Sequence, residues 1–308
     1  MAQHGRTLAV TLSLGILTPS CNSSQAEEFV TLRGESGNEG TLAEACNSGK
    51  CQFVNIAFLS TFGNNQAPVQ NLAGHCNPAS GTCTGQSGCC RTCQSKSSQI
   101  LLSFGGSVLA SIRTSADEAR QVADYIWNNL PGGQSDSRPL GGSVLDGVEP
   151  DTEAGGTQSY DELARSLKGH NGQGKTVYYA AVPQCPYSAT CFDGAIIISC
   201  CEIVWVQFDS NPPIERRTSM GRTDALYSRS HRWASASAAQ VLMRWPQWPG
   251  EVYSGGLVVS KALVSQALPT IWLLPEFGGL IRQKRSFYDN GYSASIKDSI
   301  YLSSLSIW

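Results

Sequence analysis

Eight short apolar segments, separated by longer stretches of helical or loop character, constrain the fold of this chain more than any other feature. Short apolar runs with little alternation are typical of parallel strands that are buried on both faces. We expect strands at residues 29–32, 53–58, 100–104, 144–148, 177–182, 204–208, 241–243 and 280–281. No repeat of solenoid length and no linker divides the series, so a single domain is predicted.

Helical patterns lie between these segments, and two of them carry start signals. Ser115 with Glu118 forms a capping-box pair, and Ser159 with Glu162 repeats it. The apolar stripes that follow are Ala119, Val122, Ala123 and Ile126 in the first helix, and Leu163 and Leu167 in the second. Strand–helix alternation of this kind predicts the α/β class and a closed (β/α)8 TIM barrel. The 308 residues of the chain exceed the about 250 that such a barrel commonly needs, and its chemistry belongs at the carboxyl ends of the strands.

The first 26 residues are predicted to be a signal peptide, which leaves residues 27–308 as the barrel domain. His4 and Arg6 precede an apolar run at residues 8–17, and Ser24 and Ala26 offer the small side chains that a signal peptidase reads. The run is too short to cross a bilayer; the alternative is a buried first strand or helix. We therefore expect a secreted, extracellular protein with no membrane partner.

Composition excludes some partners and points to the same compartment. The formal net charge is −2 and no basic face stands out, so nucleic acid is not expected as a partner. Twelve cysteines are present, and a secreted chain uses them by default in disulfides. Cys90 and Cys93 form a single CxxC that has no matching pair elsewhere, so no metal site is expected.

Three acids at alternate positions stand out near the fourth predicted strand. On an extended strand Glu149, Asp151 and Glu153 project to the same side, about 6.5–7 Å apart along the strand. Like charges this close raise the pKa of at least one carboxyl in such a set, and a carboxyl that stays protonated can donate to a leaving oxygen. The alternative is a solvated acidic loop, because Pro150 and the glycines at 155 and 156 are typical of loops.

The segment at residues 146–153, Asp-Gly-Val-Glu-Pro-Asp-Thr-Glu, resembles the signature of glycoside hydrolase family 18. Further stretches are similar to plant class III chitinases of the hevamine type, among them residues 37–42, 54–59, 71–78, 137–141, 183–186, 204–208, 211–213 and 290–293. The resemblance runs from about residue 28 to residue 300. It implies an endochitinase that cuts β-1,4-linked N-acetylglucosamine polymers, with retention of configuration and without a cofactor or metal.

The resemblance also implies roles for individual residues. Glu153 matches the general acid, Asp151 the residue that orients the acetamido group of the substrate, and Glu149 a supporting acid deeper in the barrel. Positions that match substrate-contacting residues are Asn71, Gln207 and Asp209. The cysteines imply the pairs Cys46–Cys93 and Cys76–Cys83, whereas Cys185 is left to pair with Cys191, Cys200 or Cys201, or to stay free. We expect a monomer, in the apoplast or vacuole of a plant, that binds chitin or its oligomers.

Several departures fall where the sugar is expected to bind. The Tyr-Trp-Gly-Gln of the family reads Leu-Arg-Gly-Glu at residues 32–35, Asp209 stands in place of a tyrosine, and residues 282–285 hold no tryptophan. Sugar rings are held by aromatic faces, and binding energy drives distortion of the reacting sugar, so weakened catalysis is expected. The alternative is a non-catalytic relative: a chitinase-like lectin, a xylanase or amylase inhibitor, or a storage protein.

Overall fold

The structure, a computed structural model, describes part of the chain. The described residues are 28–33, 41–47, 51–63, 66–72, 74–106, 115–132, 135–152, 159–173, 177–181, 201–207, 240–244 and 277–282. The predicted signal peptide at residues 1–26 lies outside them, as do Cys185, Cys191 and Cys200. No helix among the described residues has the length and apolar character needed to span a membrane.

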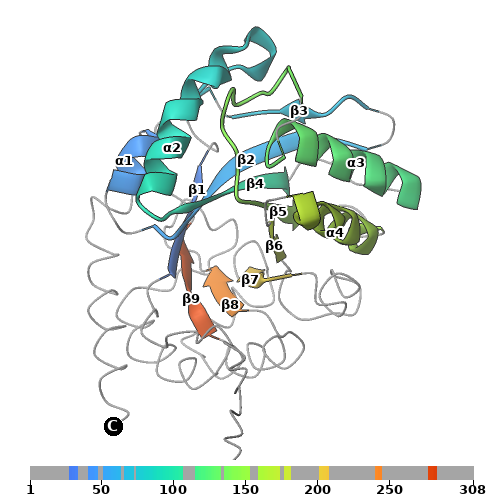
Figure 1. The fold of residues 1–308 in the computed structure, drawn as a ribbon. Coiled ribbons are helices and arrows are strands. Elements are labelled where there is room, and N and C mark those ends of the chain that lie inside the picture. Colours follow the sequence, from blue (N-terminus) through green and yellow to red (C-terminus); the bar gives the residue numbers. More distant parts are fainter. Residues whose placement is uncertain are drawn as a thin grey trace, which may run out of the picture.

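Eight parallel strands close into a ring, which confirms the predicted α/β barrel (Figure 1). Closure follows from the pairing of β1 with both β2 and β9. The strands of the ring are β1 (Glu28–Arg33), β2 (Phe53–Thr61), β4 (Gln99–Gly106), β5 (Gly147–Thr152), β6 (Tyr178–Ala181), β7 (Ile203–Gln207), β8 (Gln240–Arg244) and β9 (Phe277–Arg282). Each of the eight predicted segments overlaps one of them. A short strand that was not predicted, β3 (Val69–Gln70), pairs antiparallel with β2 alone.

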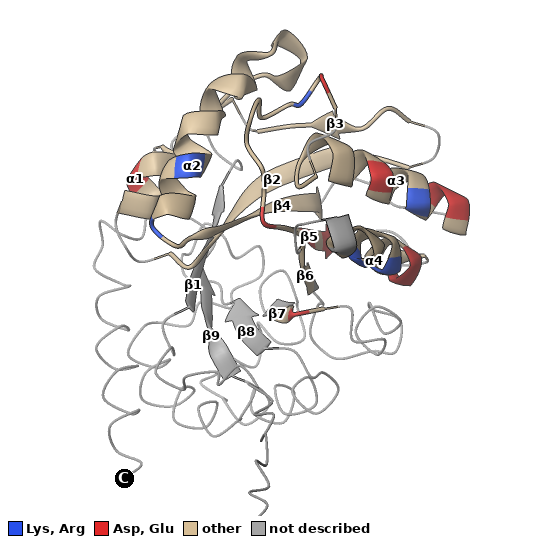
Figure 2. Ribbon diagram, viewed as in Figure 1, with Lys and Arg blue, Asp and Glu red and all other residues tan. Residues whose placement is uncertain are grey.

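The described helices lie outside the ring (Figure 1). They are α1 (Leu42–Asn47), α2 (Ser87–Ser95), α3 (Ala116–Asn129) and α4 (Tyr160–Gly169), with 3-10 turns at Pro78–Ser80, Thr82–Gln86 and His170–Gln173. The predicted stripes of α3 and α4 are buried. Figure 2 shows charged residues on both of these helices. Arg120 of α3 contacts Asp117 of the same helix and Glu162 of α4.

The two predicted helix starts have different outcomes. Ser115 has an extended backbone, and its side chain accepts a hydrogen bond from the Glu118 amide at 3.1 Å, so the first capping box is confirmed at its N-cap. The second prediction is wrong. Ser159 has a left-handed backbone (φ 66°) and makes no side-chain capping bond. A serine caps a helix from an extended backbone, and this conformation points its hydroxyl elsewhere.

Alternate residues of the strands fill the interior of the barrel. Phe53, Leu101, Ala180, Ile203 and Trp205 form one buried cluster, although they come from β2, β4, β6 and β7. Strands that are not neighbours can meet in this way only across the lumen, so these residues define the inner face of the barrel. Residues two positions away on the same strand share that face.

Both implied disulfides are present. The α1–α2 disulfide joins Cys46 and Cys93, with a Cα–Cα distance of 5.0 Å and a sequence separation of 47. The short-loop disulfide joins Cys76 and Cys83, with the same Cα–Cα distance and a separation of 7. The predicted connectivity of these four cysteines is therefore confirmed.

Candidate active site

Strand β5 carries two of the three predicted acids into the barrel. Gly147 pairs with Leu101, which belongs to the inner cluster. Glu149 and Asp151 follow at alternate positions and therefore share this inner face. The two residues are 2% and 1% exposed. The alternative of a solvated acidic loop is wrong for residues 147–152, which form a central strand whose residues 147–151 are buried.

Strand β4 supplies the surroundings of both acids. Ser103 is opposite Glu149 in the parallel register, and its hydroxyl donates a hydrogen bond to Glu149 Oε2. Gly105 is opposite Asp151 and has a φ of 116°, a conformation that favours glycine. Strand β4 therefore places a hydroxyl donor opposite the first acid and a glycine opposite the second.

Proline at position 150 fits the strand because of where the ladder to β6 ends. β5 continues beside β4 as far as Thr152 but pairs with β6 only at Gly147 and Val148. Backbone groups alternate between the two neighbours of a strand, and the Asp146 carbonyl accepts from the Tyr178 amide of β6. Backbone groups two residues apart on a strand face the same neighbour, so position 150 faces β6, as Asp146 O does. The amide that Pro150 lacks would therefore point to β6, past Val148, where the pairing with β6 ends. The proline thus removes no hydrogen bond of the described ladders.

Asp146 fixes the entry to β5. Its Oδ2 accepts from the Ile100 amide at 2.8 Å and from Gln94 Nε2 at 3.0 Å. Its own amide donates to Ile100 O at 2.7 Å. These bonds join β5 to β4 and α2, and they set the register that places Ser103 against Glu149. A one-residue slip would turn both acids to the other face.

Arg138 holds the segment before β5 against the end of α3. Its guanidinium donates to Leu130 O at 2.7 Å, to Asn129 O at 3.3 Å and to Ser143 O. Partial burial lowers the pKa of Arg138 from its ordinary value, because desolvation opposes the charge. The cation nevertheless neutralises the carbonyl end of the helix.

The other predicted site residues have separate outcomes. Asn71 is exposed and joined to Phe58 of β2 by two backbone hydrogen bonds of 2.9 Å, near the carboxyl end of that strand. Gln207 is the last residue of β7, two positions after the inner residue Trp205. Gln207 and the two acids of β5 thus lie on strands of the same barrel, and Asn71 lies beside strand β2. Glu153 and Asp209 lie outside the described residues.

Two inward polar residues were missed by the sequence analysis. Ser103 is fully buried and Asn55 is 1% exposed. Asn55 pairs with Leu101 of the inner cluster. Each interrupts an apolar strand with a polar side chain, and this signal, on the inner parity of a barrel strand, could have identified them. Among the described residues no group of three His, Cys, Asp or Glu side chains is placed to hold a metal ion.

A closed parallel barrel with polar groups on the inner face of its strands is the architecture of a (β/α)8-barrel enzyme, which carries its site at the carboxyl ends of the strands. Comparisons identify the family. The chain is 45% identical to an acidic endochitinase of Nicotiana tabacum over 276 residues, which cover 90% of this chain and 93% of that protein. No protein-family model matches the chain.

Solved structures agree with this comparison. A chitinase from Ipomoea carnea superposes with a TM-score of 0.82 and 37% identity, over 88% of this chain and 99% of that one. A xylanase and α-amylase inhibitor protein from Scadoxus multiflorus superposes with a TM-score of 0.80 and 28% identity, over 88% and 98%. The chain belongs to the family of plant acidic endochitinases, the class III chitinases of glycoside hydrolase family 18.

Proposed function

We propose that this protein is an endochitinase that hydrolyses β-1,4-linked N-acetylglucosamine polymers with retention of configuration. The observation that carries the proposal is the buried acid pair Glu149 and Asp151 on the inner face of β5, in a chain 45% identical to an acidic endochitinase over most of its length. Two carboxyl groups in a barrel interior are costly to keep, which favours a functional reason for them.

The proposed division of labour follows the family. Glu153 donates a proton to the glycosidic oxygen as general acid. The carbonyl oxygen of the substrate's own acetamido group attacks the anomeric carbon, and Asp151 orients that group and stabilises the charge it gains. Glu149 supports Asp151 from below, held by the hydroxyl of Ser103. The scheme needs no cofactor and no metal.

We further propose that turnover is limited by how the sugar is positioned. The aromatic residues that the family uses to hold the ring are replaced, most clearly at Asp209. Glu149 is one methylene longer than the family's aspartate, and a misplacement of about 1 Å near the reacting group can cost on the order of 100-fold in rate. Chitin oligomers are the proposed substrate, and the protein is proposed to act as a secreted monomer after loss of residues 1–26.

Hydrolysis of a soluble chitin hexamer by purified protein tests the proposal. Glu153→Gln is expected to lower kcat by at least about 100-fold, the usual contribution of a general acid. Asp136→Asn, which removes a carboxylate from an exposed loop, should leave kcat unchanged and is the matched control. Equal rates for the wild type and Glu153→Gln would refute the acid assignment.

A second experiment tests the positioning argument. The double variant Asp209→Tyr with Glu149→Asp is expected to raise kcat at least about 10-fold, which is about 1.4 kcal/mol in the barrier. Circular dichroism confirms that the variant is folded. A folded double variant without any gain would contradict a limit set by sugar positioning.

The alternative is a non-catalytic inhibitor of a xylanase or amylase. It is favoured by the superposition on the inhibitor protein from Scadoxus multiflorus together with the replaced aromatic residues. A wild-type protein that leaves the hexamer intact but inhibits a xylanase or an α-amylase would establish this alternative. The intact mass of secreted material tests removal of the leader, and sedimentation tests the monomer.

A further inference from the structure

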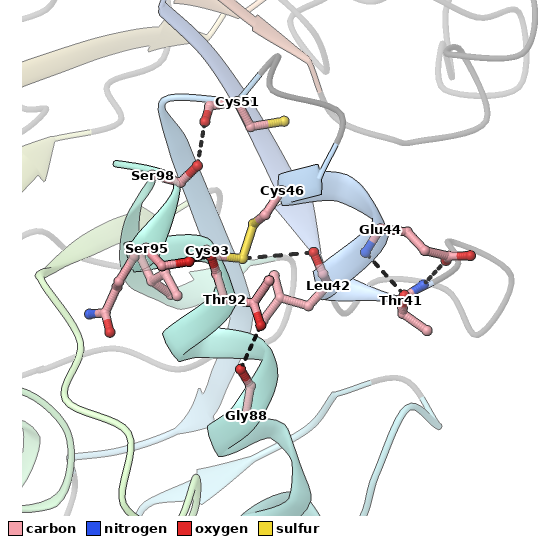
Figure 3. The surroundings of a disulfide bond; sticks show 12 residues. Thr41, Leu42, Glu44, Cys46, Cys51, Gly88, Thr92, Cys93, Ser95 and Ser98 are labelled. Atoms are coloured by element: carbon pink, nitrogen blue, oxygen red, sulfur yellow. Dashed lines mark hydrogen bonds between the residues drawn. A yellow bond between two sulfur atoms is a disulfide. The ribbon is translucent and has the colours of Figure 1, made fainter.

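Figure 3 shows the α1–α2 disulfide, and a buried thiol lies one helical turn before it on α2. Cys90 and Cys93 are both on α2, three residues apart, and both are 0% exposed. Cys93 is bonded to Cys46 of α1, whereas Cys90 is a free thiol. Residues three apart on a helix share one face, so Cys90 lies on the same face of α2 as Cys93, and its side chain hydrogen-bonds Ser143. Cys89 is free as well but only partly buried.

We propose that Cys90 is an internal nucleophile for this disulfide, so that the protein can exchange Cys46–Cys93 for a Cys90–Cys93 bond within α2. In the exchange Cys90 loses its proton to solvent and its thiolate attacks Cys93 Sγ. The bond between the sulfurs of Cys46 and Cys93 breaks, and Cys46 leaves as a thiolate that takes up a proton. One disulfide is broken and one is formed, so no oxidant or reductant is consumed.

Helix geometry permits the new bond. Residues three apart on an α-helix have Cα atoms about 5 Å apart, within the range of about 4.4–6.8 Å found in disulfides. Their Cβ atoms, about 5–6 Å apart in a regular helix, must approach to about 4 Å. Cys90 is the fourth residue of α2, and the N-cap residue Gln86 makes no side-chain capping bond. Cys93 is the seventh residue, so the turn that must adjust lies in the middle of the helix.

The exchange would act as a switch on the first helix of the barrel. The α1–α2 disulfide is the only described covalent link between α1 and the rest of the barrel apart from the chain itself. After exchange, α1 would be held by packing alone, while α2 would carry an internal CxxC bridge. Burial raises the pKa of the Cys90 thiol, and Cys89 and Asp146 raise it further, whereas the hydrogen bond with Ser143 and the charge of Arg91 lower it; the net direction is upward. Little thiolate is therefore present near neutral pH, and the exchange is slow there. Its rate should rise about tenfold per pH unit until that pKa is reached.

Trypsin separates the two pairings. Cleavage after Arg33, Lys50, Arg91 and Lys96 yields peptides 34–50, 51–91 and 92–96, which carry Cys46, Cys90 and Cys93 respectively. The full-length protein is incubated at pH 5 or pH 8.5, denatured in acid with N-ethylmaleimide, digested and mapped by mass spectrometry. We expect peptide 92–96 to move from peptide 34–50 to peptide 51–91, with at least threefold more exchanged product at pH 8.5 than at pH 5.

Three variants distinguish the attacking thiol. Cys90→Ser should abolish the exchange, and Cys90→Ala replaces it if the serine variant does not fold. Cys89→Ser is the matched control and should exchange like the wild type. Peptide 51–91 also contains Cys51, so exchange that persists in Cys90→Ser would assign the attack to another thiol and overturn the proposal. A wild-type protein that keeps only the Cys46–Cys93 link after a day at pH 8.5 would also overturn it.

Discussion

Replacing Arg138 with methionine should destabilise the protein far more than removing a surface arginine that contacts two carboxylates. Arg138 has no described carboxylate partner, yet its guanidinium donates to three backbone carbonyls at the junction of α3 and the segment before β5. Arg120 contacts two carboxylates on the surface of α3 and α4. If the number of ion pairs determined stability, Arg120 would contribute more to the free energy of unfolding than Arg138.

The expected loss of stability depends on the hydrogen bonds that each substitution removes and on the carbonyl groups that it leaves without a donor. Hydrogen bonds to a charged group contribute about 1.5–3 kcal/mol each, and an abandoned buried carbonyl costs about 1–3 kcal/mol. Arg138 is only half-buried and its cation is partly desolvated, so solvent screening reduces the total well below the sum. We expect Arg138→Met to lower the free energy of unfolding by about 3 kcal/mol. Arg138→Lys keeps the charge but loses the planar fork and should recover less than half of the loss.

Ion pairs on the surface contribute little to the free energy of unfolding, because water competes for both partners and two long side chains must be held in one geometry. Arg120→Met should therefore change the urea midpoint by much less than Arg138→Met. Urea unfolding of oxidised protein, followed by circular dichroism, measures all three variants. The reasoning is refuted if Arg120→Met shifts the midpoint as far as Arg138→Met does.

Three further comparisons use matched variants and the same unfolding assay. Gly147→Ala would place its Cβ 2.4 Å from a backbone oxygen of β6 and should cost about 1–3 kcal/mol, whereas Gly142→Ala, whose nearest contact is 3.7 Å away, should be close to neutral. Replacing both cysteines of the α1–α2 disulfide with alanine should lower the free energy of unfolding by about 4 kcal/mol, and replacing those of the short-loop disulfide should lower it by about 2.4 kcal/mol. The difference is expected because a longer closed loop restricts the unfolded chain more. Equal losses would contradict this explanation. Ser115→Ala should cost about 1 kcal/mol, whereas Ser159→Gly should stabilise by up to about 1 kcal/mol, and a loss at Ser159 would contradict the left-handed backbone.

The sequence predicted the barrel because its evidence is repeated. Eight apolar segments each overlap a strand, so an error of a few residues at one of them does not change the fold. The fourth segment shows such an error: it was predicted to begin at residue 144, and β5 begins at Gly147. The reason is local, since Val144 and Asp146 are occupied by hydrogen bonds from Gln94 of α2 before the strand pairs.

The capping boxes show where local evidence fails. Ser115 and Ser159 carry the same signature, with a glutamate three residues later, yet only Ser115 accepts a capping bond. The signature assumes that the chain arrives with an extended backbone. The surrounding barrel determines the backbone conformation with which the chain enters α4. A four-residue sequence pattern cannot predict that conformation.

In the candidate site, too, local features could be predicted from the sequence, whereas contacts between distant segments could not. That Glu149 and Asp151 share one face required only the two-residue period of a strand, and this prediction survived the error in where β5 begins. The partner of Glu149 required the register between strands 46 residues apart in sequence, which no local pattern contains. That register depends on Asp146, whose carboxylate binds the Ile100 amide, and on Gly147, whose missing side chain lets β6 approach. The first two residues of the signature Asp-Gly therefore have a structural role: they fix the height at which the acids enter the barrel, and without them the same acids would meet different neighbours.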